Sequence, residues 1–300
     1  MNKQILGYIY AVMSALLFAS ATLFMKKIFA AGMSVWDYSV AHSLAVLVTL
    51  VGLRLAQRRP LRREAFRKHR RAIPGLMVTG FIASTAFNVA LSQLSISLGT
   101  ILLFTYPAFV TLIAWAFLRH RPDRLHLVAL VLALMGTLFT VGAGGDLAVG
   151  FTWLGAGLAL LSAVSHASYL HISEHVGGEF DAISLSILTR IAVVVGSASI
   201  APHALLSMWH APWQAWAILA VSSIVGGVLP FLLLFKALDQ IGANQVGIAS
   251  VTELPFALLL GLLFEGESVT PWQGVGAVAV LGAVLLSQLR PSASGEQELI

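Results

Sequence analysis

Three residues in the second half of the sequence have the types and spacing of a metal site. His171, Glu174 and His175 fit the pattern H-x-x-E-H, in which two histidines share one face of a helix and can hold zinc. A third ligand is needed, and Glu253 is a carboxylate further along the chain. The pattern is short, however, and it stands near the end of an apolar run in a chain with nine histidines. An intramembrane zinc hydrolase is therefore only one alternative function, and no cofactor is expected.

Two charged residues lie inside long apolar runs, where charge is rare. A charge at the centre of a membrane helix costs about 2.5–3.5 kcal/mol on insertion scales, and such residues usually face a bundle interior or a cavity. Arg190 suits a carboxylate that accepts two hydrogen bonds, although a pairing with Glu253 or Asp239 would satisfy it equally well. Glu253 can bind an ammonium group, carry a proton or pair with Arg190.

Neutral polar residues extend this set of candidates. Ser162, His166 and Tyr169 recur at helical spacing in one run, and histidine can exchange protons near neutral pH. The residues predicted to line a substrate site are Arg190, Glu253, Tyr106, Tyr169, His166, His42, Ser43, Ser162, Asn88 and Thr252. For each of them, the alternative is a structural role in packing or hydrogen bonding.

The composition indicates what surrounds these residues. The 300-residue chain is 58% apolar and 10% charged, whereas soluble domains are roughly 45–50% apolar and about 25% charged. So few charges cannot cover the surface of a soluble protein of this size, which leaves lipid as the solvent for most of it. The chain contains no cysteine, so disulfides and thiol chemistry are excluded.

Apolar runs long enough to cross a bilayer as helices, about 17–25 residues, recur along the whole chain. We predict ten membrane helices, at 5–25, 36–55, 73–94, 99–118, 125–141, 151–170, 183–200, 213–237, 243–264 and 272–289. Because proline removes a backbone donor, we expect kinks at Pro107, Pro230 and Pro255. The predicted fold class is an all-α integral membrane protein.

The chain also repeats itself. GYIYAVMSALLFAS from Gly7 pairs with GAGLALLSAVSHAS from Gly155, at an offset of 148 residues. HSLAVLV pairs with TRIAVVV, and ALSQL with ALDQI, both at an offset of 147. The predicted organisation is thus two five-helix repeats, 1–145 and 146–290, followed by a polar tail at 291–300. Since five is odd, the second repeat is inverted, which is typical of transporters with a substrate site near the membrane midplane.

One loop carries much of the positive charge. Eight of the eighteen Lys and Arg residues lie within fourteen positions, namely Arg58, Arg59, Arg62, Arg63, Arg67, Lys68, Arg70 and Arg71. Cytoplasmic loops are enriched in such residues, so this run predicts a topology anchor beside anionic headgroups, with both termini in the cytoplasm. The run lacks interleaved aromatic residues for base stacking, and no nucleic-acid partner is expected.

Two segments resemble the EamA-type branch of the drug/metabolite transporter superfamily. They are ALSQL…TILLFTYPAFVTLIAWAF from Ala90 and ALDQIGANQVGIASVTELPFALLLGLLFEGESVTPWQGVGAVAVLGAV from Ala237. The resemblance implies a basket of helices one to four and six to nine around a central cavity, with helices five and ten peripheral. The family's arginine in the second helix of each repeat maps onto Arg190 and, in the first repeat, onto Ser43.

The resemblance also implies a function. Members export amino acids, other metabolites or drugs across a bacterial inner membrane, and they are not enzymes. Within this superfamily, the prediction is a secondary transporter that resembles the YddG-type aromatic amino-acid exporters and works by alternating access as a monomer or weak homodimer. Tyr106, Tyr169, Phe18 and Trp115 are the candidates for an aromatic pocket. A multidrug or other metabolite exporter of the same fold remains an alternative.

Overall fold

The computed structural model describes residues 3–58, 63–91, 93–94, 96–117, 119, 121–142, 152–266 and 268–289. Almost all of these residues are helical, and none of them forms a strand. The helices of the first half are α1 (Lys3–Ala30), α2 (Val35–Ala56), α3 (Arg63–Lys68), α4 (Ala72–Leu91), α5 (Ile96–Leu103), α6 (Tyr106–Ala116) and α7 (Arg124–Gly142). Those of the second half are α8 (Trp153–Gly177), α9 (Ala182–Ile200), α10 (Ala204–Ser207), η1 (Met208–His210), α11 (Trp213–Ser222), η2 (Ser223–Val228), α12 (Leu229–Ser250), α13 (Glu253–Glu265) and α14 (Pro271–Gln288).

Within the described residues, nine helical stretches are long and apolar enough to span a membrane. One of them, Trp213–Ser250, is 38 residues long and contains a break at Gly242, where φ is 74° and ψ is 169°. This break ends the eighth pass and begins the ninth, which α13 completes. The ten passes confirm the predicted fold class, and the break at Gly242 agrees with the predicted start of the ninth helix at residue 243.

The fourth and ninth passes are both interrupted near their middle. α5 ends at Leu103 and α6 starts at Tyr106, while α12 ends at Ser250 and α13 starts at Glu253. At each break a threonine hydroxyl donates to the carbonyl three residues back: Thr105 to Leu102 at 2.6 Å, and Thr252 to Ala249 at 2.7 Å. These pairs are related by the offset of 147, so the break itself is part of the repeat.

Proline follows each irregular stretch. Pro107 is the second residue of α6, and Pro255 is the third residue of α13, positions at which a missing amide costs little. Pro230 is the second residue of α12, the helix that directly follows η2, a π-helical segment at Ser223–Val228. The first half has no π-helix at the corresponding place in α4, so the two repeats differ there.

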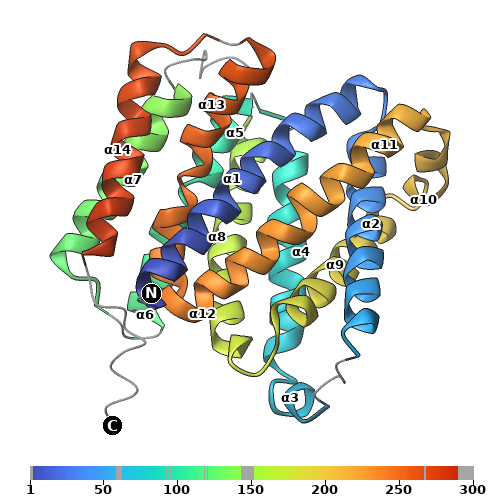
Figure 1. Cartoon of the computed structure of the whole chain (residues 1–300), viewed down its shortest axis with the longest axis horizontal. Helices are drawn as coiled ribbons and strands as arrows, with labels where there is room; N and C mark the ends of the chain where they lie inside the picture. Colours follow the sequence, from blue (N-terminus) through green and yellow to red (C-terminus); the bar gives the residue numbers. More distant parts are fainter. Residues whose placement is uncertain are drawn as a thin grey trace.

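The main helix contacts between the repeats have equivalents in which the two repeats change places. α1 packs along α12 and α8 packs along α4, while α2 meets α9 and α7 meets α14 (Figure 1). A serine pins each of the first two pairs: Ser14 donates to the Pro230 carbonyl at 2.8 Å, and Ser162 donates to the Ala83 carbonyl at 2.6 Å. The donors are 148 residues apart and the acceptors 147, so the two bonds are repeat equivalents.

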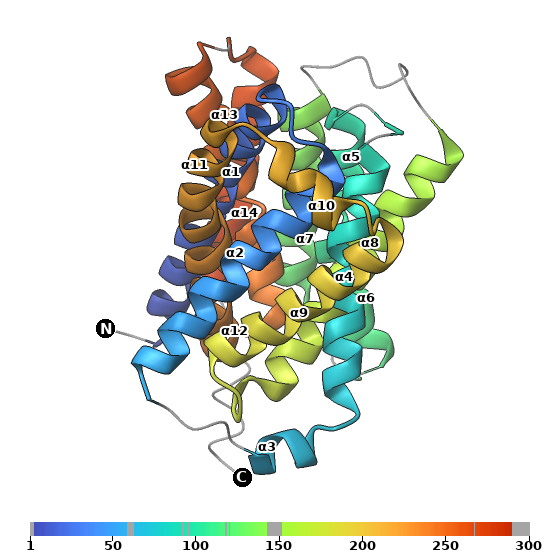
Figure 2. The same cartoon turned by 90° about the vertical axis from the view of Figure 1, so that its right-hand side faces the viewer.

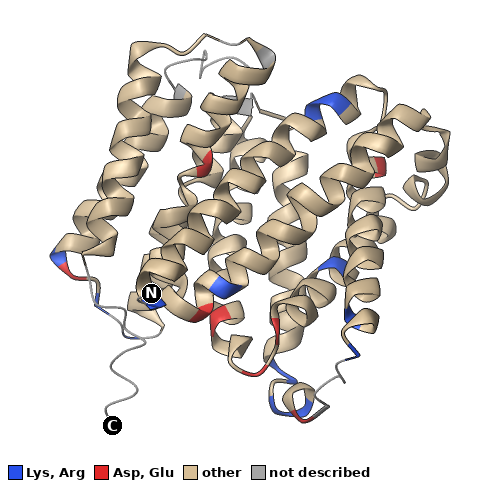
Figure 3. Cartoon of the chain, in the orientation of Figure 1, with Lys and Arg blue, Asp and Glu red and all other residues tan. Residues whose placement is uncertain are grey.

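Both ends of the described helical bundle lie on the same side. Gln4 Nε2 donates to the Gln288 carbonyl at 3.0 Å, which joins the start of α1 to the end of α14. We call this side the inner end; α3 lies there as well (Figures 1 and 2). Figure 3 shows Lys and Arg concentrated towards this end. The predicted boundary at 145/146, the tail 291–300, and Arg59 and Arg62 lie outside the described residues.

Candidate functional site

Arg190 is the one membrane-embedded arginine of the candidate set, and it lies in the middle of α9 with 8% of its surface exposed. Its guanidinium carbon is 4.4 Å from the centroid of the Phe231 ring of α12. Tyr38 and Tyr169 are close enough to interact with it electrostatically. No carboxylate of the described residues forms an ion pair with it, so the pairing with Glu253 or Asp239 is not formed.

Polar groups on α2 face the same region. The Tyr38 ring stacks on His42, with centroids 5.1 Å apart, and His42 interacts electrostatically with Arg190. Ser222 lies within hydrogen-bonding reach of both residues, through its side chain to Tyr38 and through its backbone to His42. Polar groups of α2 and α11 thus lie beside Arg190.

A row of rings leads from Arg190 towards Glu253. The His166 ring lies 6.2 Å from the Tyr169 ring and nearly parallel to it, and 4.7 Å from the Tyr106 ring, edge to face. Tyr106 in turn interacts electrostatically with Glu253, the first residue of α13. Five of the predicted residues are therefore linked in succession across α9, α8, α6 and α13, by ring contacts in the middle and by electrostatic interactions at the two ends.

The hydroxyls of two other predicted residues form hydrogen bonds within the protein. Ser162 is fully buried and donates to the Ala83 carbonyl, and Thr252 donates to the Ala249 carbonyl. Ser43 is buried on α2, at the position equivalent to Arg190, and Asn88 is half-buried on α4. A binding role for these four residues stays a prediction.

The aromatic candidates Phe18 and Trp115 lie in different environments, one inside the bundle and one on its surface. Phe18 meets Phe231 edge to face at 5.1 Å and so belongs with the Arg190 region, whereas Trp115 is 55% exposed on the outer surface. Sequence reasoning missed Tyr38, Phe231 and Ser222. Tyr38 stands four residues before His42 and thus on the same helix face, which was a usable signal. Nothing in the sequence placed Phe231 over Arg190.

The H-x-x-E-H residues do not converge on a common point. His171 Nε2 lies 2.8 Å from the Val110 carbonyl, and its Nδ1 is 3.6 Å from Glu174 Oε2. The His175 ring instead faces His69, at 5.6 Å. In the described part of the chain, no three His, Cys, Asp or Glu residues are grouped so that they can hold a metal ion.

Ion pairs tie the two repeats together at the inner end. Arg54 of α2 binds Asp181, and Lys68 of α3 binds Glu179. Asp181 also caps α9 by accepting the Ser184 amide at 2.9 Å. Burial on its own raises the pKa of Asp181, but hydrogen bonds from Ser184 and Arg54 outweigh it and the pKa is lowered. The hydrogen bond from Lys68 lowers the pKa of Glu179.

The equivalent cap at the other end of the bundle has no charge of its own, and the Asp37 carboxylate nearby accepts a hydrogen bond from Ser207. Ser34, 147 residues before Asp181, caps α2 by accepting the Asp37 amide at 3.1 Å. A neutral cap thus replaces the charged one. The two ends of an otherwise repeated structure are therefore fastened by different chemistry.

A family model matches nearly the whole chain. The EamA-like transporter family is matched twice, over residues 5–142 and 153–289. A solved crystal structure superimposes with a TM-score of 0.75 at 15% identity, covering 94% of this chain and 98% of that one. At this identity the likeness shows a shared fold.

Several curated proteins are similar in sequence. The uncharacterized transporter YcbK of Bacillus subtilis is 24% identical over 225 residues, covering 73% of this chain and 72% of YcbK. The threonine/homoserine exporter RhtA of Escherichia coli is 28% identical over 204 residues, covering 68% of this chain and 66% of RhtA. Human solute carrier family 35 member G1 is 25% identical over 301 residues, covering 95% of this chain and 79% of its own.

Proposed function

The chain belongs to the EamA-like transporter family, and on that premise we propose that it is a secondary transporter that exports amino acids by alternating access. Two inverted repeats with interrupted fourth and ninth passes are the features on which such a mechanism depends. The similarity to a threonine/homoserine exporter supports a metabolite of this class.

The observation that carries the proposal is that Arg190 is buried without a carboxylate partner among the described residues. Its charge is buried among membrane-spanning helices, and in the described residues an aromatic face and hydroxyl-bearing rings surround it where a carboxylate would be expected. A buried charge without a partner is costly. A substrate carboxylate would supply the missing negative charge through two parallel hydrogen bonds, with His42 and Ser222 nearby to accept or donate further bonds.

Glu253 is proposed to receive the substrate amine. It stands at the far end of the row of rings, beyond the reach of an α-amino acid whose carboxylate is held by Arg190. The substrate would therefore meet Glu253 at a different point along the row, where its side chain contacts His166 and the tyrosines. His166 and Glu253 lie deep in the bundle yet keep an intermediate exposed fraction. This combination supports a cavity beside them that water and substrate can enter.

Two observations favour different amino acids. The rings of Tyr38, Tyr169 and Phe231 favour an aromatic substrate, since they can pack edge to face or stack on it. The relative that exports threonine and homoserine favours a small hydroxylated substrate, for which His42 and Ser222 offer hydrogen bonds. Competition between phenylalanine and threonine in counterflow, in which an unlabelled amino acid on one side drives uptake of labelled amino acid, separates the two.

The role of Arg190 is tested in proteoliposomes. We expect Arg190→Ala to abolish counterflow and Arg190→Lys to restore only a small part of it, because lysine cannot form the two-pronged contact. Lys236→Ala is the matched control, since Lys236 is an exposed cation of α12 that lies 5.5 Å from the Tyr10 ring. Undiminished counterflow by folded Arg190→Ala protein would remove the carboxylate role.

We also propose that the inner end faces the cytoplasm of a bacterial cell. The described basic residues Arg67, Lys68, Arg70 and Arg71 gather there, in accord with the enrichment of such residues in cytoplasmic loops. The chain has no cysteine, so a single Gln57→Cys substitution, at an exposed residue of this end, gives an unambiguous label. Modification of that cysteine by an impermeant maleimide in intact cells would overturn the orientation.

A further inference from the structure

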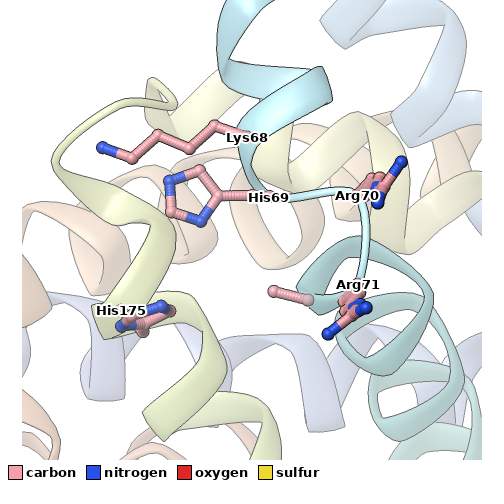
Figure 4. Close-up of a pocket in the computed structure, with 6 residues that line it drawn as sticks. Lys68, His69, Arg70, Arg71 and His175 are labelled. Atoms are coloured by element: carbon pink, nitrogen blue, oxygen red, sulfur yellow. The ribbon is translucent and has the colours of Figure 1, made fainter.

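A basic pocket of about 340 Å³ opens at the inner end, between the turn joining α3 to α4 and the last turns of α8 (Figure 4). Its lining consists of Lys68, His69, Arg70, Arg71, Ala72 and His175. Its volume is within the range of small-molecule sites, roughly 300–1,000 Å³. Apart from Ala72, every lining residue is a cation or a histidine, and the lining contains no carboxylate.

The walls of this pocket are held in place by contacts on both sides. The turn is tight, since His69 donates its amide to the Ala65 carbonyl and accepts from the Ala72 amide, both at 2.9 Å. Phe66 of α3 packs edge to face on Phe180 at 4.9 Å, and His69 faces His175. The opposite walls therefore keep a defined separation, as a binding site requires.

The positive charges of the pocket are not all neutralised by neighbouring carboxylates. Glu179 neutralises Lys68 and lies 3.3 Å from His69 Nε2. Arg70 and Arg71 have no ion-pair partner among the described residues. Two guanidinium groups without carboxylates, beside two histidines that can donate hydrogen bonds, match the oxygens of a phosphate group in charge and in hydrogen-bonding capacity.

We propose that this pocket binds a phosphate group, supplied either by the headgroup of an anionic lipid or by a free phosphate ion. Arg71 directly precedes α4, which begins at Ala72 and enters the membrane. The pocket thus lies at the level where headgroups concentrate and where basic residues attract anionic lipid. A bound phosphate joins the α3–α4 turn to α8 and so strengthens the connection between the two repeats at this end.

The site is tested by ligand-induced stabilisation, because a ligand that binds the folded protein raises its thermal midpoint. Purified full-length protein is titrated in neutral detergent with short-chain phosphatidylglycerol, with short-chain phosphatidylcholine, and with inorganic phosphate against chloride at equal ionic strength. Apparent affinities are measured for the native chain, for Arg70→Gln/Arg71→Gln and for Arg58→Gln/Arg67→Gln. Both double variants remove two charges from the same loop, but only the first alters the pocket lining.

We expect phosphatidylglycerol to raise the thermal midpoint of the native chain. Its apparent affinity is expected to be at least about tenfold lower in Arg70→Gln/Arg71→Gln, since two charge-assisted contacts are lost, and nearly native in Arg58→Gln/Arg67→Gln. The same pattern with inorganic phosphate alone identifies the free ion as the source and supports the site equally. His175→Ala removes the α8 wall without touching the basic run, and it is expected to weaken the response as well. Equal losses in both double variants, or no response to either phosphate ligand, would overturn the proposal.

Discussion

At the scale of the residue, the two charges in the bundle interior have different surroundings. Arg190 lies over the Phe231 ring and is approached by tyrosine hydroxyls, whereas Glu253 has Tyr106 as its electrostatic neighbour. An arginine over an aromatic face is attracted to it by about 0.5–2 kcal/mol, which does not neutralise the charge. Each group can thus meet one charged group of an amino acid, at a different point along the row of rings.

This complementarity predicts how substrate analogues behave. Glu253→Gln is expected to weaken binding of the amino acid about tenfold or more, because one charge-assisted contact is lost. The same variant is expected to bind the deaminated 2-hydroxy acid as the native chain does. Arg190→Gln is expected to show the reverse pattern, losing the amino acid while retaining the corresponding amine. Binding is measured by isothermal titration, and equal losses for both analogues in either variant contradict the assigned contact.

At the scale of the element, the two repeat-equivalent serines fasten equivalent helix pairs. We expect Ser14→Ala and Ser162→Ala to destabilise the protein by similar amounts, about 0.6–1.7 kcal/mol each, as interhelical hydrogen bonds in membranes do. The measurement is unfolding in mixed micelles. Ser168→Ala is the control, because its hydroxyl bonds to the Val164 carbonyl of its own helix. A large cost for one serine and none for the other would show that the repeats are fastened unequally.

The peripheral pair α7 and α14 depends on a close approach at one glycine. A Cβ on Gly276 would lie 2.4 Å from the Thr140 amide nitrogen and 2.7 Å from the Gly136 carbonyl oxygen, and backbone atoms cannot move aside cheaply. Gly276→Ala is therefore expected to destabilise the protein by about 1–3 kcal/mol, the usual cost of overpacking. Gly274→Ala on the same helix meets nothing within 4 Å and is expected to be harmless. Equal thermal midpoints for the two variants would contradict this packing.

Much of the element level could be predicted because lipid imposes simple rules. Apolar runs of spanning length revealed ten passes, and the offset of 147 paired the segments that turned out to be equivalent. Helix contacts were harder, since runs that are apolar on every side show no face that must be buried. For that reason Tyr38 on α2 and Phe231 on α12 were missed as neighbours of Arg190. The short helix α3 and the π-helix η2 left no periodic signal.

At the scale of the whole molecule, the inner end is fastened by pH-sensitive ion pairs. Because the folded-state pKa of Asp181 is lowered below its unfolded value of about 3.9, this residue contributes stability above about pH 4. The contribution disappears as the pH falls through the folded pKa. The difference in thermal midpoint between the native chain and Asp181→Asn is therefore expected to be largest near neutral pH and to vanish in acid. Glu64→Gln, at an exposed residue of α3, is the control, and a pH-independent difference would contradict the assignment.

The same ion pairs bear on alternating access. If the two repeats exchange conformations during transport, an opening at one end must accompany a closing at the other. The structure is tied at its inner end by Arg54–Asp181, and the equivalent Ser34 cap at the outer end has no charge. Breaking the inner tie is therefore expected to shift the population towards a state open at the inner end, by no more than the free energy of the tie.

Spin-label distances measure both ends of this movement, since the chain contains no native cysteine. Gln57→Cys with Gly178→Cys reports the inner end, and Ala30→Cys with His203→Cys reports the outer end; all four positions are exposed. Arg54→Gln is expected to lengthen the inner distance and to shorten the outer one, while Arg54→Lys, which keeps the charge, changes both much less. Lengthening at the inner end without a matching change at the outer end would mean that the bundle merely loosens there, and the two repeats would then not move as a coupled pair.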